Sequence, residues 1–169
     1  MPVTNLNLDE EKNELLGELD HLNSLVGLAK SLMKRRKDVK LFTAIQNDLF
    51  VLQAGVVCPN STPALQKERV FDLQKETYGI ESTLEPLDHF LIPEGTTGSC
   101  VLHCVRTQAR AVERKTVGYL DNPTIVAFYM DQLACLMFAL ARDMNRRSGI
   151  HERQPTYVTR KRRRSNNPA

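Results

Sequence analysis

Long hydrophobic runs and paired cysteines are missing from this sequence of 169 residues, and we expect it to lack a targeting signal. No apolar run approaches the roughly 20 residues that a membrane-spanning helix needs. The four cysteines lack paired spacing, which favours a reducing compartment over a disulfide scaffold. The acidic start at residues 9–11 lacks the basic-then-apolar pattern of a secretory signal. We therefore expect a cytoplasmic protein that makes no membrane contact.

Net positive charge is confined to the end of the chain. The net charge is +3, but residues 151–169 hold six basic side chains against one acid, which leaves the body at −2. Such a body does not suit nucleic-acid binding, although the run Arg160–Arg164 resembles a localisation or nucleic-acid patch. The plainer interpretation is a single domain over residues 1–150 followed by a basic, disordered tail over residues 151–169.

Alternation typical of strands is not evident, and apolar residues recur instead at helical spacing. The first seam keeps to one helical face: Leu15, Leu19, Leu22, Val26, Ala29 and Met33. Similar seams predict helices over residues 9–33, 38–56, 63–84, 97–117 and 123–148. With 41% apolar and 25% charged residues, the chain can bury a core of ordinary size. The predicted fold is an all-α, five-helix up-and-down bundle.

The segment before the fourth helix is the least helical part of the chain. Pro86, Pro93 and Gly95 predict a shaped loop there, and Thr96 is one of three hydroxyl residues able to cap the helix that follows. Pro123 at the first helical position opens the fifth helix. The loop before the fourth helix is therefore the place where the bundle departs from simple turns.

One face of the fourth helix is strongly polar. Arg106, Arg110, Glu113 and Arg114 fall at i, i+4, i+7 and i+8, so they share that face. Three guanidinium groups can clamp a phosphate or a carboxylate. A stripe of this kind is more often solvated or salt-bridged than catalytic, and composition alone favours that simpler interpretation.

Three motifs, in a fixed order along the chain, favour a binding site over a merely solvated stripe. Residues 89–114 read H-F-L-I-P-E-G-T-T-G-S-C-V-L-H-C-V-R-T-Q-A-R-A-V-E-R, residues 17–27 read G-E-L-D-H-L-N-S-L-V-G, and residues 45–50 read I-Q-N-D-L-F. Their kind and order resemble the ATP:corrinoid adenosyltransferases of the PduO type. The resemblance implies a five-helix bundle that forms a homotrimer with active sites between subunits. It also implies transfer of the 5′-deoxyadenosyl group of ATP to the cobalt of cob(I)alamin, with release of triphosphate and help from Mg²⁺.

The resemblance assigns roles to particular side chains. It implies that Arg106 pairs with Asp20 of the partner subunit and that Arg110 faces the triphosphate, so these three form the implied catalytic set. Phe90 matches the aromatic that packs over the corrin and helps to exclude a lower axial ligand. The implied ligands are cobalamin, ATP and Mg²⁺, with no metal-ligating side chain. The implied cofactor-binding residues are Phe90, Glu113, Arg114 and Thr96.

Four departures from the family pattern weigh against catalysis. The seven residues before the first helix contain no glycine, so we expect the family's glycine-rich phosphate cradle to be missing. Glu94 replaces a loop glycine and places a carboxylate near the expected ligands. Ala111 replaces a second arginine, and Asp131 stands where the family favours asparagine. Together these changes predict weaker ATP binding, because carboxylates repel a triphosphate.

Two functions therefore stay open for the bundle. The first is a diverged but active adenosyltransferase, and the second is a corrinoid-binding or assembly subunit without ATP turnover. A scaffold that contacts nucleic acid through the tail is a third, weaker hypothesis. A zinc site at Cys100, His103 and Cys104 lacks a second cluster of ligands, so we expect buried thiols on a bundle helix instead.

Overall fold

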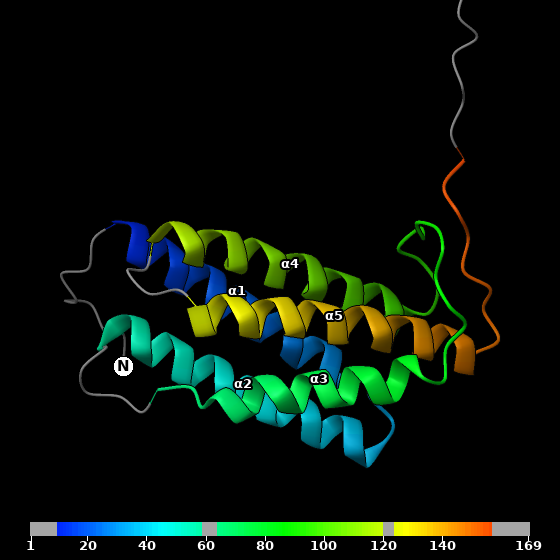
Figure 1. Cartoon of the computed structure of the whole chain (residues 1–169), viewed down its shortest axis with the longest axis horizontal. Coiled ribbons are helices and arrows are strands. Elements are labelled where there is room, and N and C mark those ends of the chain that lie inside the picture. The colour runs from blue at the N-terminus through cyan, green and yellow to red at the C-terminus, as the bar shows by residue number, and fades with distance from the viewer. Residues whose placement is uncertain (1–9, 59–63, 120–123, 157–169) are drawn as a thin grey trace, which may run out of the picture.

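The computed structural model describes residues 10–58, 64–119 and 124–156, and these residues form five helices and no strand. The helices are α1 Glu10–Ser31, α2 Arg36–Val57, α3 Lys67–Glu81, α4 Thr97–Tyr119 and α5 Thr124–Arg147. Consecutive helices run in alternating directions (Figure 1). The predicted all-α up-and-down bundle is confirmed.

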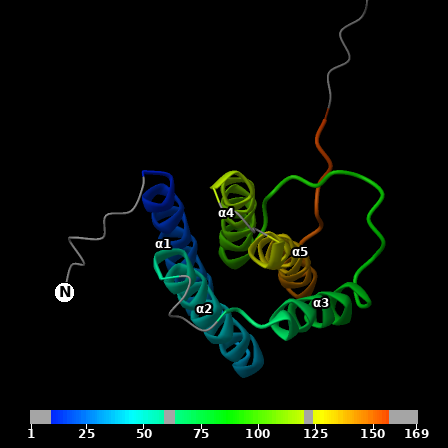
Figure 2. The same cartoon turned by 60° about the vertical axis from the view of Figure 1, so that its left-hand side comes forward.

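The order of the helices in space differs from their order in the chain. α1 packs between α2 and α4, and α5 packs between α4 and α3 (Figure 2). α4 therefore has a neighbour on each side, and the side chains that point away from both neighbours remain available to a ligand or a second molecule. The polar stripe predicted from the sequence belongs to this central helix.

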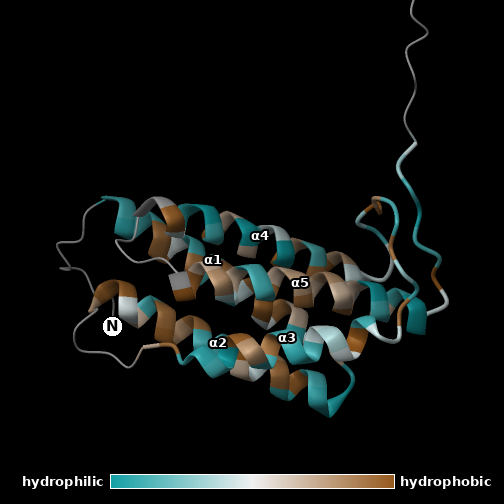
Figure 3. Ribbon diagram, viewed as in Figure 1, coloured by the Kyte–Doolittle hydropathy of each residue, from teal (hydrophilic) through white to brown (hydrophobic). Residues whose placement is uncertain are grey.

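The core follows the predicted seams. All six residues of the first predicted seam are buried, although Met33 lies just beyond the end of α1. Each helix carries both hydrophilic and hydrophobic residues (Figure 3). The best buried side chains come from every helix: Tyr129, Phe42, Leu15, Leu19, Leu22, Ile45, Leu49, Leu73, Leu102, Met130, Leu133 and Leu136. Burial of this kind is the main favourable contribution to folding.

The third helix is shorter than predicted. It runs from Lys67 to Glu81 rather than from residue 63 to residue 84. After Glu81 the backbone tightens into three-residue turns, in which the amide of Thr83 donates to the carbonyl of Ile80 and the amide of Leu84 to that of Glu81. Pro86 disfavours a helical backbone at Glu85, so the helix does not resume after these turns.

A buried ionic network joins the outer helices to α5. The guanidinium of Arg69 on α3 donates to the carboxylate of Asp48 on α2, with a shortest distance of 2.8 Å. The hydroxyl of Tyr129 on α5 donates to the same carboxylate, also at 2.8 Å. Burial, together with the charge of Asp48, raises the pKa of Tyr129. Each of these polar groups has a hydrogen-bond partner, so the network fixes the orientation of three helices without leaving a buried charge unpaired.

Within the described residues, α5 is the one helix long and apolar enough to span a membrane by length and composition. Half of its most apolar window is buried inside the bundle. A core helix of a bundle gives the same signal, and its position between α3 and α4 accounts for the apolar character.

Candidate functional site

The loop before α4 is fixed at its end by Asn145 near the C-terminus of α5. The side-chain amide of Asn145 donates to the carbonyl of Glu94 at 2.9 Å, and its oxygen accepts from the amide of Thr96 at 3.2 Å. Gly95 between them has a φ of +129°, and a Cβ there would lie 2.0 Å from the Asn145 oxygen. Glycine is therefore required by both the backbone conformation and the close approach of Asn145.

Thr96 caps α4, as the sequence predicted for this residue or its neighbours. Its hydroxyl oxygen accepts the amide hydrogen of Ser99 at 3.1 Å, which is the usual contact between an N-cap and the third helical residue. One of the free amides at the helix start is thereby satisfied. The hydroxyl of Thr96 serves the protein backbone in this arrangement, and its predicted part in ligand binding stays a prediction.

Arg106 lies against an aromatic ring and has no carboxylate partner among the described residues. Its guanidinium carbon stands 5.9 Å from the ring centroid of Phe138 on α5, a cation–π distance. Its Nε is buried and makes no hydrogen bond. The ring of Phe138 also contacts His103 on the same side of α4, with centroids 6.0 Å apart. The Nε of Arg106 is therefore a donor that no acceptor among the described residues satisfies.

His103 is buried beside this cation. Burial, with a smaller contribution from Arg106, holds the pKa of His103 below its ordinary value, and its Nδ1 has no hydrogen-bond partner.

The cysteines on either side of His103 are more exposed than the sequence predicted. Cys104 is exposed and Cys100 half-buried, so the prediction of two buried thiols is wrong. The reason is that position 104 points away from the core residues of α4, such as Val105.

Arg110 is held by two carboxylates of its own chain. Its guanidinium donates to Glu113 at 2.8 Å and to Asp131 on α5 at 2.6 Å. The bond to Glu113, with the charge of Asp131, raises the pKa of Arg110 further. These three side chains are all partly exposed. The structure thus brings together two of the predicted site residues, Arg110 and Glu113, and adds Asp131, which the sequence marked as a departure.

The remaining predicted residues lie on exposed surface. Arg114 is exposed on the last turns of α4, and Asp20 is exposed on α1. The structure shows no contact between Asp20 and Arg106 within the described chain, and the predicted pairing with a partner subunit stays a prediction. Phe90 is 81% exposed at the loop before α4. A large aromatic side chain so exposed is ready to pack on a flat apolar ligand.

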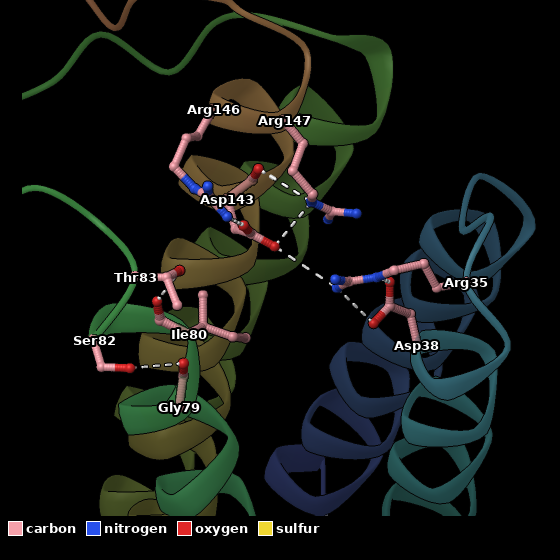
Figure 4. A network of polar contacts seen from close by, with 9 residues as sticks. All are labelled: Arg35, Asp38, Gly79, Ile80, Ser82, Thr83, Asp143, Arg146 and Arg147. Carbon is pink, nitrogen blue, oxygen red and sulfur yellow. Dashed lines mark hydrogen bonds and ion pairs between the residues drawn. The ribbon is translucent and has the colours of Figure 1, made fainter.

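A second ionic cluster secures the ends of the helices near this loop. The buried carboxylate of Asp143 on α5 pairs with Arg146 at 2.6 Å and Arg147 at 3.0 Å, and it lies 3.7 Å from Arg35, which also binds Asp38 (Figure 4). The cluster ties the C-terminus of α5 to the turn between α1 and α2. Its pairs within each helix end are local, whereas the contact of Arg35 with Asp143 joins segments that are distant along the chain and depends on the fold.

Three pockets lie on the surface of the described chain. One of about 330 Å³ lies between the loop before α4 and the residues that follow α5, and one of about 520 Å³ lies beside Asp38 and Gly98. The third, of about 710 Å³, is a mainly apolar groove between α3 and α5. Arg106 and Arg110 line none of these three pockets.

Two expectations lie partly or wholly outside the described residues. The stretch in which we expect no phosphate cradle, residues 1–9, is one of them, and the basic run Arg160–Arg164 is the other. Among the described residues, no group of three or more His, Cys, Asp or Glu side chains is placed to hold a metal ion. None of the four cysteines, all of which are described, forms a disulfide.

Sequence reasoning missed several residues that shape the site. Phe138 supports Arg106, Asn145 fixes the end of the loop, and Arg153 binds Glu94 from beyond α5. Helical periodicity indicated that Phe138 belongs to α5 but not that it meets a cation. An asparagine or arginine near a helix end is ordinary in sequence, so only the fold reveals these partners.

Comparison with known proteins agrees with the geometry. Residues 5–144 match the cobalamin adenosyltransferase family. A corrinoid adenosyltransferase of Bacillus subtilis is 30% identical over 84% of this chain and 78% of its own length. A cobalamin adenosyltransferase of Cupriavidus metallidurans is also 30% identical, over 79% of this chain and 74% of its own.

The fold has close counterparts among solved structures. A variant PduO-type ATP:corrinoid adenosyltransferase from Lactobacillus reuteri, complexed with cobalamin and ATP, superposes with a TM-score of 0.80. The two chains are 23% identical, and the match covers 88% of each. This likeness shows the bundle fold, and the match over residues 5–144 shows the family. The chain belongs to the cobalamin adenosyltransferase family.

Proposed function

We propose that this protein transfers the 5′-deoxyadenosyl group of ATP to the cobalt of a reduced corrinoid. In that reaction a bond forms between cobalt and the 5′ carbon, the bond from that carbon to oxygen breaks, and triphosphate leaves. The observation that carries the proposal is the guanidinium of Arg106, which has a buried Nε and no carboxylate partner in the described chain of a protein from this family. The names of the relatives from B. subtilis and C. metallidurans support it.

The proposed chemistry needs fixed positive charge and an apolar wall. Negative charge grows on the triphosphate as it leaves, and a preorganised cation such as Arg110 stabilises it without reorganising. Phe90, which is largely exposed, would lie against the corrin face and keep polar ligands and water away from the metal. Glu113, Arg114 and Thr96 complete the proposed binding set. We assign no magnesium ligand on the described chain, so the phosphates themselves would bring that ion.

We also propose that the site is completed by a second copy of the chain within a cytoplasmic homotrimer. Arg106 lacks a carboxylate in its own described chain, and Asp20 is an exposed carboxylate on the neighbouring helix α1. A pairing of Arg106 with Asp20 of the partner subunit would satisfy both. Light scattering coupled to size exclusion should give about three times the chain mass of 19.2 kDa, and a monomer that transfers adenosyl groups would contradict this arrangement.

The function is tested by mixing the purified protein with ATP and chemically reduced cob(I)alamin under anaerobic conditions. We expect the absorption spectrum of cob(I)alamin to give way to that of adenosylcobalamin, with one triphosphate released per adenosyl group. A correctly folded protein that leaves the spectrum unchanged would overturn the proposal. A sample without ATP is the control for slow oxidation of the reduced corrinoid.

One observation favours a second candidate, a corrinoid-binding subunit without ATP turnover. Arg110, the residue expected to face the triphosphate, is already bound to Glu113 and Asp131. ATP must compete with both carboxylates for this guanidinium. Calorimetric titration separates the two functions: an active transferase binds ATP and corrinoid, whereas the second candidate binds corrinoid alone.

A further inference from the structure

The residues that follow α5 turn back along the loop that presents Phe90. We call residues 150–156 the strap and residues 82–96 the Phe90 loop. The two segments lie side by side at the same end of the bundle in both views (Figures 1 and 2). Six hydrogen bonds connect the loop to three residues of α5 and the strap, which are Arg142, Asn145 and Arg153.

The strongest connection is an ion pair between the loop and the strap. The Nε and Nη2 atoms of Arg153 donate to the two carboxylate oxygens of Glu94, each at 2.5 Å. In addition, the backbone amide of Ile92 donates to the carbonyl of Arg153 at 2.9 Å. A forked pair fixes orientation as well as distance, and the backbone bond sets the two segments in register. Arg153 lowers the pKa of Glu94, as expected for a paired carboxylate.

A second residue ties the start of the loop to the strap. Arg142 on α5 is nearly buried, with 12% of its side chain exposed. Its Nε donates to Glu152 at 3.1 Å, and its Nη2 donates to the carbonyl of Glu85 at 2.9 Å. The guanidinium also lies 6.0 Å from the ring centroid of Phe138, the ring that supports Arg106. One arginine therefore connects the strap, the loop and the arginine face of α4.

These contacts hold both ends of the Phe90 loop and leave its centre exposed. The carbonyl of Glu85 is fixed at one end, and Glu94 and Thr96 are fixed at the other. Phe90 lies between them and is 81% exposed. Beneath lies the pocket of about 330 Å³, which is lined by residues of both segments, among them Leu87, Leu91 and Ile150. The loop is thus held by α5 at both ends and by the strap at Ile92 and Glu94, next to Phe90.

We infer that the strap positions Phe90 for the corrinoid, and that Glu94 and Arg153 are the positioning residues that couple the two segments. The inference rests on the proposed function. Glu94 does not repel the ligands in this arrangement, because its charge is matched by Arg153. The sequence led us to expect that this carboxylate repels a triphosphate, and the ion pair with Arg153 would weaken that repulsion.

The test uses the full-length protein and two readouts. Hydrogen exchange over residues 86–93 reports whether the strap orders the loop, and cob(II)alamin titrations followed by absorbance report corrinoid affinity. In Arg153→Ala and Glu94→Gln we expect faster exchange in the loop and a corrinoid Kd raised about threefold to tenfold, the range for an exposed but forked ion pair. The ATP Kd should stay unchanged, since neither residue lies on the arginine face.

Two further variants control the experiment. Arg36→Ala removes an exposed arginine at the start of α2, and we expect it to alter neither readout. The double variant Glu94→Arg with Arg153→Glu restores an ion pair with reversed charges, and it should recover slower exchange and part of the affinity.

The possible outcomes are distinct. Unchanged exchange in both single variants would overturn the inference, as would faster exchange without any change in a measurable corrinoid affinity. If the wild-type protein binds no corrinoid although exchange responds to the substitutions, the proposed function fails while the coupling of strap and loop stands. If ATP affinity falls together with corrinoid affinity, the two residues belong to the general architecture and the positioning role is overturned.

Discussion

Two half-buried arginines lie on opposite sides of α5, and they differ in whether a carboxylate of the same chain binds them. Arg69 on α3 is matched by the buried carboxylate of Asp48, which also accepts the hydroxyl of Tyr129. Arg106 on α4 lies over Phe138, and its buried Nε has no partner in the described chain. The first arrangement is complete within one molecule. The second becomes complete only when a ligand or another subunit supplies negative charge.

The difference separates architecture from function within one fold. A buried charge with all its partners stabilises an orientation of helices and needs nothing further. An arginine left without a partner reduces stability, and a protein retains it where binding recovers the cost. Substitutions in the complete network should therefore reduce stability most, whereas substitutions around Arg106 and Arg110 should act mainly on binding and catalysis.

Asp48→Ala should cause the largest loss of stability. It leaves the guanidinium of Arg69 and the hydroxyl of Tyr129 without their buried partner, and breaking a buried pair costs about 3–5 kcal/mol. Urea unfolding followed by circular dichroism measures the change. Asp72→Ala is the matched control, because Asp72 pairs with the same Arg69 but is 58% exposed, and its loss should cost about 1 kcal/mol or less. Equal losses in the two variants would contradict the complete network.

Gly95→Ala and Gly79→Ala should change stability in opposite directions. At Gly95 the φ of +129° and the approach of the Asn145 oxygen predict a loss of about 1–3 kcal/mol. Gly79 lies in α3 with nothing within 4 Å of an added Cβ, so alanine should stabilise that helix by about 0.5–1 kcal/mol. Differential scanning calorimetry gives both signs. A Gly95→Ala protein as stable as the wild type would show that the loop is not held by Asn145.

Asp131→Asn should strengthen ATP binding without destabilising the bundle. The substitution keeps the shape of the side chain but removes one of the two negative charges that hold Arg110. We expect the ATP Kd to fall about threefold to tenfold, because less anionic competition opposes the triphosphate. Isothermal titration calorimetry measures the Kd, and Glu68→Gln on the exposed start of α3 is the charge-matched control. An unchanged Kd would place Asp131 away from the bound anion.

The smallest expected effect is a pH dependence of stability carried by His103. Burial and Arg106 hold its folded-state pKa below the ordinary value of 6.5. Between the two pKa values the unfolded chain binds more protons, so the free energy of unfolding falls as the pH drops below about 6.5. Urea titrations at pH 7.5 and 5.5 should show a smaller fall for His103→Gln than for the wild type. The exposed His21, replaced in the same way, serves as the control, and equal behaviour of both variants would contradict the assignment.

The fold was largely predictable because it depends on local periodicity. The apolar seam of α1 was buried as expected, and Thr96 capped α4 as its hydroxyl suggested. The boundaries of α3 were less accurate, because a short stretch of tight turns after Glu81 has no separate signal in sequence. Helical spacing also placed Arg106, Arg110 and Glu113 on one side of α4.

The partners of those residues were not predictable in the same way. Asp131 is 21 residues from Arg110, and Arg153 is 59 residues from Glu94, so neither pairing follows from local spacing. An ion pair between distant segments depends on the packing of several helices, and a single sequence does not encode it as a pattern. The charge of Glu94 was visible in the sequence, but the arginine that matches it was not.

The rate of adenosyl transfer by Arg106→Met tests the central claim most directly. Methionine keeps much of the apolar contact with Phe138 but removes the unmatched charge. With ATP and cob(I)alamin supplied, the account predicts a rate at least about 100-fold lower than that of the wild type, with helical content unchanged, whereas Arg36→Met keeps the full rate. An Arg106→Met protein that forms adenosylcobalamin at the wild-type rate would contradict the account.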